Sequence, residues 1–464
     1  MSFITSALAF LFALTILIAI HEFGHFWVAR KMGVKVLRFS IGFGKPLLKY
    51  MSKSGTEYVL AWIPLGGYVK MLDEREGDVS DDERHMAFTQ KSVYARFAIV
   101  AAGPAFNLLF AVAAYWVIAV IGVAGYKPLI GDVTQDSAAA VAGFQAGDEV
   151  TGVAGGAVAT WGSVRFAMLK GVMDGGSLAF EVDRDGKKVD LQLDMTDGAG
   201  VLQGGQLASA LGLSMQGLDY PPRIDQVTAG ARGEMGGLKT GDLILSADGQ
   251  PVKTWHDWVL LIQASPEKSI SVELDRDGVI ITTDVTPALF EAKCRTYGKI
   301  GVSPQFEQKW VDAIRSEEIY GAGAGIGVAL DKTWNMSILM LKMMGKIVIG
   351  EASVKNISGP IMIAQVAGKT ASIGVVSFIT FLAIISISLG VLNLLPIPLL
   401  DGGHLFFYLF EIVLRKPVSD TIQVWGQKVG LVILFLMMSI ALYQDVNRLF
   451  EGCENVSAQQ DNKK

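Results

Sequence analysis

Two histidines and a glutamate near the start of the chain have a spacing that suits a metal ion. His21, Glu22 and His25 form an H-E-x-x-H motif. Residues four apart share one face of an α-helix, so both imidazoles could bind one Zn²⁺. Glu22 could then remove a proton from a water that the ion activates. The motif therefore predicts a hydrolytic zinc site with His21 and His25 as ligands and Glu22 as the catalytic residue.

The motif lies at the end of a long uncharged run. No charged residue precedes Glu22, and the next one after it is Arg30. A pattern with three fixed positions also arises by chance, so the motif alone is only a hypothesis. Ionisable side chains inside a membrane span are costly and usually functional, and this placement favours the catalytic interpretation.

A third ligand is predicted near the other end of the chain. Asp401 is the only charged residue between Thr370 and Phe410. It follows a helix break at Pro396, and irregular backbone at membrane depth is tolerated where it lines a cavity. Three protein ligands would leave one position for water, as in catalytic zinc sites. The alternative is that Asp401 merely begins a polar link.

Composition places the chain in the membrane class. Hydrophobic residues make up 51% of the 464 residues and charged residues 18%, with a mean hydropathy of +0.40. Soluble domains usually have about 25% charged residues. The net charge of −5 means that the chain has no excess of positive charge, so nucleic acid is not expected as a partner. Cys294 and Cys453 are too far apart to suggest a metal site or a disulfide framework.

Four uncharged runs predict a multi-span α-helical membrane protein. The first lacks the basic start and cleavage site of a signal peptide, so it is expected to remain as a helix. Lys and Arg gather between the first two spans and between the last two, which predicts that both links are cytoplasmic. Both termini and the long central segment would then face the periplasm of a Gram-negative inner membrane. The predicted spans are 1–30, 97–126, 370–400 and 429–446, followed by a polar tail at 447–464.

The central segment contains a duplication. The stretch from Ala142 to Asp148 matches that from Gly236 to Asp242, and Trp161 corresponds to Trp255. Strand-like runs alternate with Gly-Asp and Asp-Gly turns, which predicts two compact domains at 127–219 and 220–310. The A-G-x-x-x-G-D pattern resembles bacterial PDZ domains, which usually capture a peptide by adding it to a sheet edge. The alternative is a pair of rigid spacers.

Together these features resemble the site-2 protease family of intramembrane zinc metalloproteases, in its bacterial form. The resemblance rests on the H-E-F-G-H motif, the stretch from Asn393 to Asp401, the tandem repeat and the order of the spans. Gly103 to Asn107 also matches a G-x-x-x-N element of the family, and Pro64 to Lys70 lies in a stretch like its membrane-associated β-hairpin.

The resemblance implies one Zn²⁺ per chain, held by His21, His25 and Asp401. It also implies a hairpin at about 55–72 within the cytoplasmic loop 31–96, interfacial helices within 311–369, and a cytoplasmic link at 401–428 that carries the third ligand. Substrate contacts are expected at Asn393, Asn107, Gly66, Gly67 and Tyr68.

The expected substrates are single-pass membrane proteins already trimmed on the periplasmic side. Anti-sigma factors and remnant signal peptides are the expected classes, and the process would be regulated intramembrane proteolysis in a stress response. The PDZ-like pair would exclude untrimmed substrates by size.

Two alternatives stay open. A membrane zinc protease of another family would use a Glu as its third ligand, so Asp401 distinguishes it. A noncatalytic scaffold that displays two PDZ-like domains would have no need of Glu22 beside two ligands.

Overall fold

The computed structural model describes residues 3–75, 77–196, 207–216, 220–292, 295–305 and 307–461. The chain folds into two compact units. A mainly helical unit comprises the described residues up to Val123 and those from Glu318 to Asp445. A β-rich unit comprises the described residues from Ala124 to Glu317, together with the end of the chain after Asp445.

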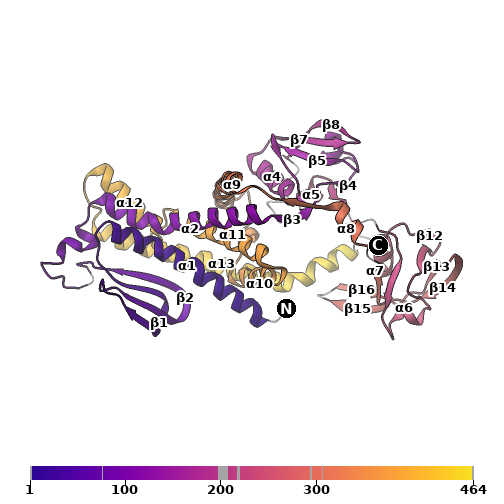
Figure 1. Ribbon diagram of the computed structural model, residues 1–464, viewed down its shortest axis with the longest axis horizontal. Helices are drawn as coiled ribbons and strands as arrows, with labels where there is room; N and C mark the ends of the chain where they lie inside the picture. The colour runs from indigo at the N-terminus through magenta and orange to yellow at the C-terminus, as the bar shows by residue number, and fades with distance from the viewer. Residues whose placement is uncertain are drawn as a thin grey trace. The chain divides into compact units, whose positions relative to one another are not determined.

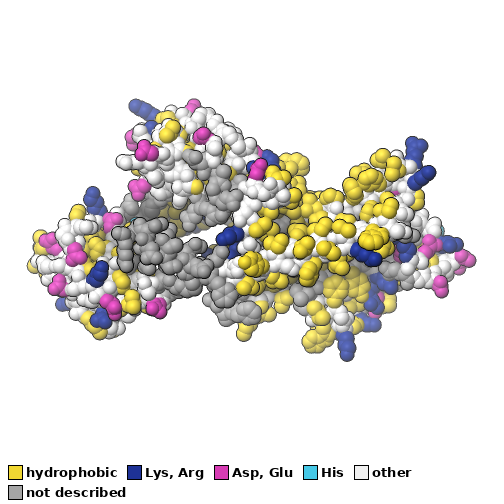
Figure 2. All heavy atoms as spheres, turned by 180° about the vertical axis from the view of Figure 1, so that it is seen from behind, with side chains coloured by type: hydrophobic (Ala, Val, Ile, Leu, Met, Phe, Trp, Pro, Cys, Tyr) yellow, Lys and Arg dark blue, Asp and Glu magenta, His cyan; other side chains and the backbone are white. Residues whose placement is uncertain are grey.

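Long apolar helices dominate the first unit (Figure 1). They are α1 (Phe3–Lys31), α2 (Val93–Ile121), α9 (Ala322–Val348), α10 (Pro360–Ile373), α11 (Val375–Leu394), α12 (Asp401–Leu414) and α13 (Asp420–Asp461). Among the described residues, four helices have the length and composition to cross a membrane: α1, α2, α11 and α13. On the face shown in Figure 2, hydrophobic side chains gather over this unit, and charged side chains gather at one end of the unit.

Helix boundaries differ from the uncharged runs for local reasons. The run at 370–400 is divided by Gly374, whose φ of 144° separates α10 from α11. α2 begins before Arg96 because the Ser92 side chain accepts a hydrogen bond from the Ala95 amide, which caps the helix. The segment predicted as a link at 401–428 begins with the helix α12, whose first residue is Asp401, and α13 starts well before the predicted fourth span.

α2 is the central helix of the unit. Its Ala111, Tyr115 and Ile118 form a core cluster with Ala329 of α9 and Ala383 of α11. α9, predicted as part of an interfacial segment, is a continuous helix whose Lys332 ammonium lies 5.0 Å from the Tyr115 ring centroid. The small residues of α2 allow its neighbours to approach closely.

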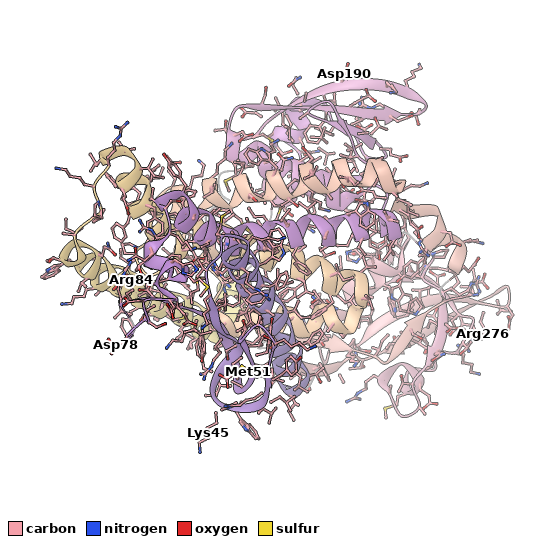
Figure 3. The ribbon with its side chains drawn as sticks, turned by 60° about the vertical axis from the view of Figure 1, so that its left-hand side comes forward. Lys45, Met51, Asp78, Arg84, Asp190 and Arg276 are labelled. Carbon is pink, nitrogen blue, oxygen red and sulfur yellow. The ribbon has the colours of Figure 1, made fainter. Side chains whose placement is uncertain are left out.

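Two long strands, β1 (Val36–Met51) and β2 (Glu57–Met71), form a sheet beside α1 (Figure 1). Left-handed backbone at Gly42, Gly44 and Gly66 bends both strands, so each contributes two segments. Residues 46–51 pair with 57–61, residues 38–41 lie beside 57–60, and residues 36–41 also pair with 67–71. Lys45 projects from the tip of this sheet (Figure 3).

The sheet is therefore larger than the hairpin predicted at about 55–72. Its first strand was missed because Gly42, Gly44 and Pro46 resemble turn residues in the sequence. The segment at 67–71 has a strand partner on one side only, so it forms an edge of the sheet.

The β-rich unit contains two segments with the same sheet order. β5 (Glu149–Val153), β6 (Gly156–Ala157), β7 (Ser177–Arg184) and β8 (Lys187–Asp194) form a sheet in the order β6-β5-β7-β8. β11 (Leu243–Ala247), β12 (Gln250–Pro251), β13 (Ile270–Arg276) and β14 (Val279–Val285) form one in the order β12-β11-β13-β14. A helix follows the short strand in each segment: α4 (Trp161–Asp174) and α7 (Trp255–Ala264), each capped by a threonine.

Each of the two segments also contains its own ion pair with a buried aspartate. Arg184 binds the buried Asp148 at 2.7 Å, and Arg276, marked in Figure 3, binds the buried Asp242 at 2.7 Å. Each arginine also donates to the carbonyl of a glycine, Gly143 or Gly237. The matching aspartates of the sequence repeat thus have the same partners in both segments.

The remaining elements are short. They are η1 (Arg84–Met86), η2 (Phe88–Gln90), β3 (Val123–Tyr126), β4 (Ile130–Val133), α3 (Ala138–Ala142), α5 (Leu207–Ala210), β9 (Leu213–Met215), β10 (Ile224–Val227), α6 (Arg232–Met235), β15 (Ala288–Ala292), β16 (Arg295–Lys299), β17 (Val302–Pro304), α8 (Gln308–Ile314), β18 (Arg315–Glu318) and η4 (Val354–Asn356).

Candidate metal centre

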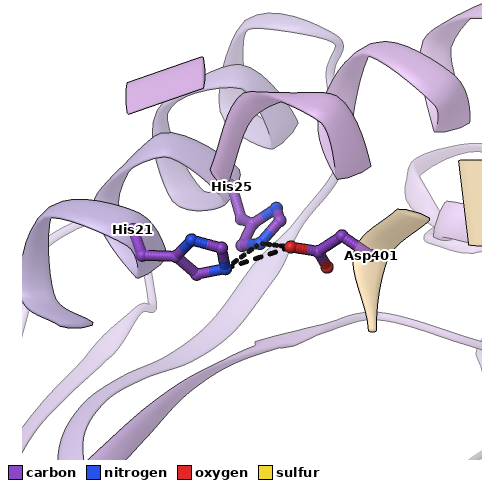
Figure 4. A group of neighbouring side chains, drawn as sticks. All are labelled: His21, His25 and Asp401. Atoms are coloured by element: carbon purple, nitrogen blue, oxygen red, sulfur yellow. Dashed lines mark hydrogen bonds and ion pairs between the residues drawn. The ribbon is translucent and has the colours of Figure 1, made fainter. Parts of the chain in front are cut away.

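Three side chains from opposite ends of the sequence converge on one point (Figure 4). His21 and His25 lie one turn apart on α1, and Asp401 is the first residue of α12. The two Nε2 atoms are 3.2 Å apart, and Asp401 Oδ2 lies 3.1 Å from that of His21 and 3.5 Å from that of His25. All three side chains are largely buried.

These separations fit a zinc ion. Zinc bonds of about 2.0–2.2 Å at a tetrahedral angle place neighbouring donor atoms roughly 3.3–3.6 Å apart. Asp401 Oδ2 is buried and, among the described residues, accepts no hydrogen bond that meets normal geometry. A buried carboxylate oxygen between two imidazole nitrogens requires a cation, so the donor set fits Zn²⁺.

Hydrogen bonds to residues of α2 orient both imidazoles. His25 Nδ1 lies 2.9 Å from the Ile99 carbonyl oxygen, which can only accept, so Nδ1 carries the proton and Nε2 is free to bind a metal. His21 Nδ1 lies 3.2 Å from the Asn107 amide, whose Oδ1 is buried and unpaired. Exchanging the oxygen and nitrogen of that amide lets Oδ1 accept from His21 Nδ1 and frees the second Nε2.

Two glycines allow α1 and α2 to approach closely enough for these contacts. A Cβ atom on Gly24 would lie 2.5 Å from the Ala102 carbonyl oxygen. A Cβ atom on Gly103 would lie 2.3 Å from His25 Nε2 and 2.8 Å from His21 Cε1. Any larger residue at either position would displace a helix or an imidazole.

Asp401 is placed by a tightly packed backbone turn. Leu399 has a φ of 108°, a region that L-residues rarely adopt, just before the helix begins. A Cβ atom on Gly402 would lie 2.0 Å from the Leu395 carbonyl oxygen. On α13, a Cβ atom on Gly430 would lie only 1.5 Å from the Pro398 carbonyl oxygen. Glycine is therefore required where this turn meets α12 and α13.

The edge of the β1–β2 sheet lies beside Glu22. A Cβ atom on Gly67 would be 3.1 Å from Glu22 Cγ. Tyr68 stacks on Phe43 and accepts a hydrogen bond from Arg38 at 3.1 Å. The strand edge and the carboxylate next to the metal ligands are thus neighbours.

The residues predicted to contact the substrate lie in different environments. Gly66 and Gly67 lie at the start of the edge segment, and a Cβ atom on Gly66 would meet the Phe43 ring at 2.2 Å. Asn107 is fully buried against His21, which favours an orienting role over contact with a substrate. Asn393 is half-buried in the last turn of α11, and its amide has no hydrogen-bond partner among the described residues.

The sequence contained no signal for the role of Ile99. Its contribution comes from a backbone carbonyl, which any residue would supply. Gly103 was part of a recognised element, but its contact with two imidazoles depends on the crossing of α1 and α2.

Comparison with known proteins gives full-length matches. The sequence profile of peptidase family M50 matches residues 9–437. The Regulator of sigma-E protease RseP of Escherichia coli strain K12 is 41% identical over 451 residues, which are 97% of this chain and 100% of the relative. A Vibrio cholerae serotype O1 protein whose name describes a zinc metalloprotease is 40% identical over 445 residues, covering 95% of this chain and 98% of the relative. The matched segment includes Glu22 and all three donor residues.

Proposed function

The chain belongs to peptidase family M50 and is a multi-pass zinc metalloprotease of the inner membrane, and we propose that its chemistry occurs at His21, His25 and Asp401. The observation that carries this proposal is the tetrahedral spacing of three donor atoms directly beside Glu22. One zinc ion per chain follows from the single set of ligands found among the described residues.

The surrounding residues suit peptide-bond hydrolysis. Bound zinc would supply a Lewis acid and lower the pKa of water to about 7. Glu22 takes the proton from the attacking water and delivers it to the leaving amine. Glu22 lies on α1 between the two histidines and next to Gly67 of the sheet edge. Asn393, with an unpaired amide, holds the substrate backbone next to the reacting carbonyl.

The sheet edge can bind a substrate segment that has unwound from its helix. Helical carbonyls are already hydrogen-bonded, so a peptide must leave the helix before attack. Among the described residues, the segment 67–71 has a strand partner on one side only, next to Glu22, so an extended substrate segment can add to its other side as a strand.

Substrate class follows from the relatives and from the charge distribution. One relative is named as a regulator of sigma-E protease, which supports an anti-sigma factor as substrate; remnant signal peptides are a second class. The basic links support a periplasmic position for the termini and the repeated domains. The two PDZ-like domains, at 127–219 and 220–310, then admit only substrates already trimmed on that side.

The test compares wild type with Glu22→Gln on a single-pass substrate truncated on its periplasmic side. Both purified proteins are assayed in detergent for cleavage and for bound zinc. We expect about one zinc per chain in both, and cleavage by wild type alone, because the amide keeps the shape of Glu22 but cannot take a proton. Asp401→Ala is the matched control, which loses both zinc and cleavage. Equal cleavage by wild type and Glu22→Gln would instead support a noncatalytic scaffold.

A further inference from the structure

We infer that Arg96 and Glu411 are a positioning pair that fixes Asp401 relative to the two histidines, although neither touches the metal centre. The inference rests on the proposed zinc site and adds residues that set its affinity. Arg96 lies near the start of α2, and Glu411 lies near the end of α12.

The pair is well ordered by several contacts. Arg96 Nη2 donates to Glu411 Oε1 at 2.6 Å, and the two side chains are only 14% and 18% exposed. The guanidinium carbon also lies 5.0 Å from the centroid of the buried Tyr408 ring, on the same helix as Glu411. Arg96 Nε donates to the Lys91 carbonyl oxygen at 3.2 Å, which holds the arginine itself. A charge-assisted bond and a cation–π contact thus link α2 to α12 at one point.

The arginine belongs to the same face of α2 that supports the histidines. Arg96, Ile99, Gly103 and Asn107 follow one another at spacings of three, four and four residues, which places them in one stripe of a helix. Three of them contact His21 or His25: Ile99 and Asn107 through hydrogen bonds, Gly103 through close packing. The first member of the stripe therefore binds the helix that supplies the third ligand.

The partner residues on α12 also share a face with the ligand. Asp401, Tyr408 and Glu411 are seven and three residues apart, so they point to the same side of α12. Phe406, Leu409 and Val413, on other faces of α12, are apolar and exposed. Apolar contacts tolerate sliding and rotation, whereas a buried ion pair fixes register. The pair therefore acts together with the packed turn at residues 399–402, and fixes the rotation of α12 that directs Asp401 at the imidazoles.

The experiment measures zinc affinity by competition with a chelating dye, together with thermal unfolding of the metal-free protein. The variants are Arg96→Gln, Glu411→Gln, and the exchanged pair Arg96→Glu with Glu411→Arg. The control is Arg84→Gln, which breaks an ion pair with Glu74 of similar length, 2.7 Å, away from α2 and α12. We expect each single variant to weaken zinc binding roughly 10- to 100-fold, the range for loss of a residue that orients a ligand. The exchanged pair should recover most of the affinity, and the control should match wild type.

The outcomes separate positioning from mere stability. A pair that only stabilises the fold would lower the unfolding temperature of the single variants and leave their zinc affinity unchanged, which would overturn the inference. An exchanged pair that binds zinc no better than the single variants would overturn it as well. If Arg96→Gln does not fold, Glu411→Gln decides, because it keeps the shape of the side chain. Failure of wild type to bind zinc would instead refute the proposed metal centre.

Discussion

Replacing Gly103 with alanine tests whether the crossing of α1 and α2 sets the ligand geometry. The new Cβ atom would lie 2.3 Å from His25 Nε2, 2.6 Å from its Cε1 and 2.8 Å from His21 Cε1. Ordinary contacts begin at 3.4 Å, so the His25 ring would have to retreat by about 1 Å or α2 would have to move away.

Neither adjustment preserves the site. His25 is held on its other side by the Ile99 carbonyl, and a shift of α2 would carry that carbonyl and Asn107 with it. Metal ligands must be held to within about 0.5 Å, and loss of supporting contacts alone costs roughly 10- to 100-fold in affinity. Because Gly103→Ala displaces a ligand itself, we expect at least roughly a 100-fold loss of zinc affinity.

The assay is competition for zinc in detergent, with thermal unfolding as a check on folding. Gly325→Ala is the matched control, because this glycine also packs on α2 but its Cβ would make only ordinary contacts of 3.5 Å or more. The control should bind zinc like wild type. Wild-type affinity in a folded Gly103→Ala protein would show that the two helices adjust without cost, and the reasoning about ligand geometry would be wrong.

Two further predictions concern stability. Asp445 of α13 accepts hydrogen bonds from the amides of Gly359, Ile361 and Met362 at the start of α10, at 3.0, 2.8 and 3.1 Å. Asp445→Ala should therefore lower the unfolding temperature. Each buried amide left unpaired should reduce the free energy of unfolding by about 1–3 kcal/mol. Asp445→Asn, which keeps an acceptor, should lose less; equal losses would argue against the hydrogen bonds as the cause. Hydrogen bonds from Lys49 and Arg38 hold the pKa of Glu57 below its usual value in the folded protein. The Glu57 carboxylate therefore stabilises the fold at pH values above its unfolded pKa of about 4.3. This contribution to stability is lost as the pH falls through the lower pKa of the folded state. The gap in unfolding temperature between wild type and Glu57→Gln should therefore close on acidification, and a gap that stays constant would contradict the assignment.

The sequence predicted the ligands but not what supports them. His21 and His25 are recognisable because helical periodicity alone brings them together, and Asp401 because a lone carboxylate at membrane depth needs a partner. The contacts of Ile99 and Gly103 were not predictable, since they depend on how two helices cross. The Arg96–Glu411 pair was missed for the same reason, because the two residues belong to distant parts of the chain.

Strand and helix boundaries were harder to predict than the spans. Runs of uncharged residues identified the four described helices that could cross a membrane, because a span needs about 20 consecutive apolar residues. β1 gave a weak signal, since its glycines and Pro46 are also typical of loops. The break at Gly374 was missed because glycine is common within membrane helices and ends them only in some contexts.

The separation of the ligands along the chain has a consequence for biosynthesis. His21, Glu22 and His25 are made first, whereas Asp401 is translated only after α1, α2 and α11, which are three of the four described helices that could cross a membrane. Chains emerge from the ribosome N-terminus first, at about 5–20 residues per second. If the proposed site is correct, a nascent chain carries the general base and two of the three zinc ligands for many seconds before the third is made. Hydrolysis would then begin only after α12 has been made and has packed against α2.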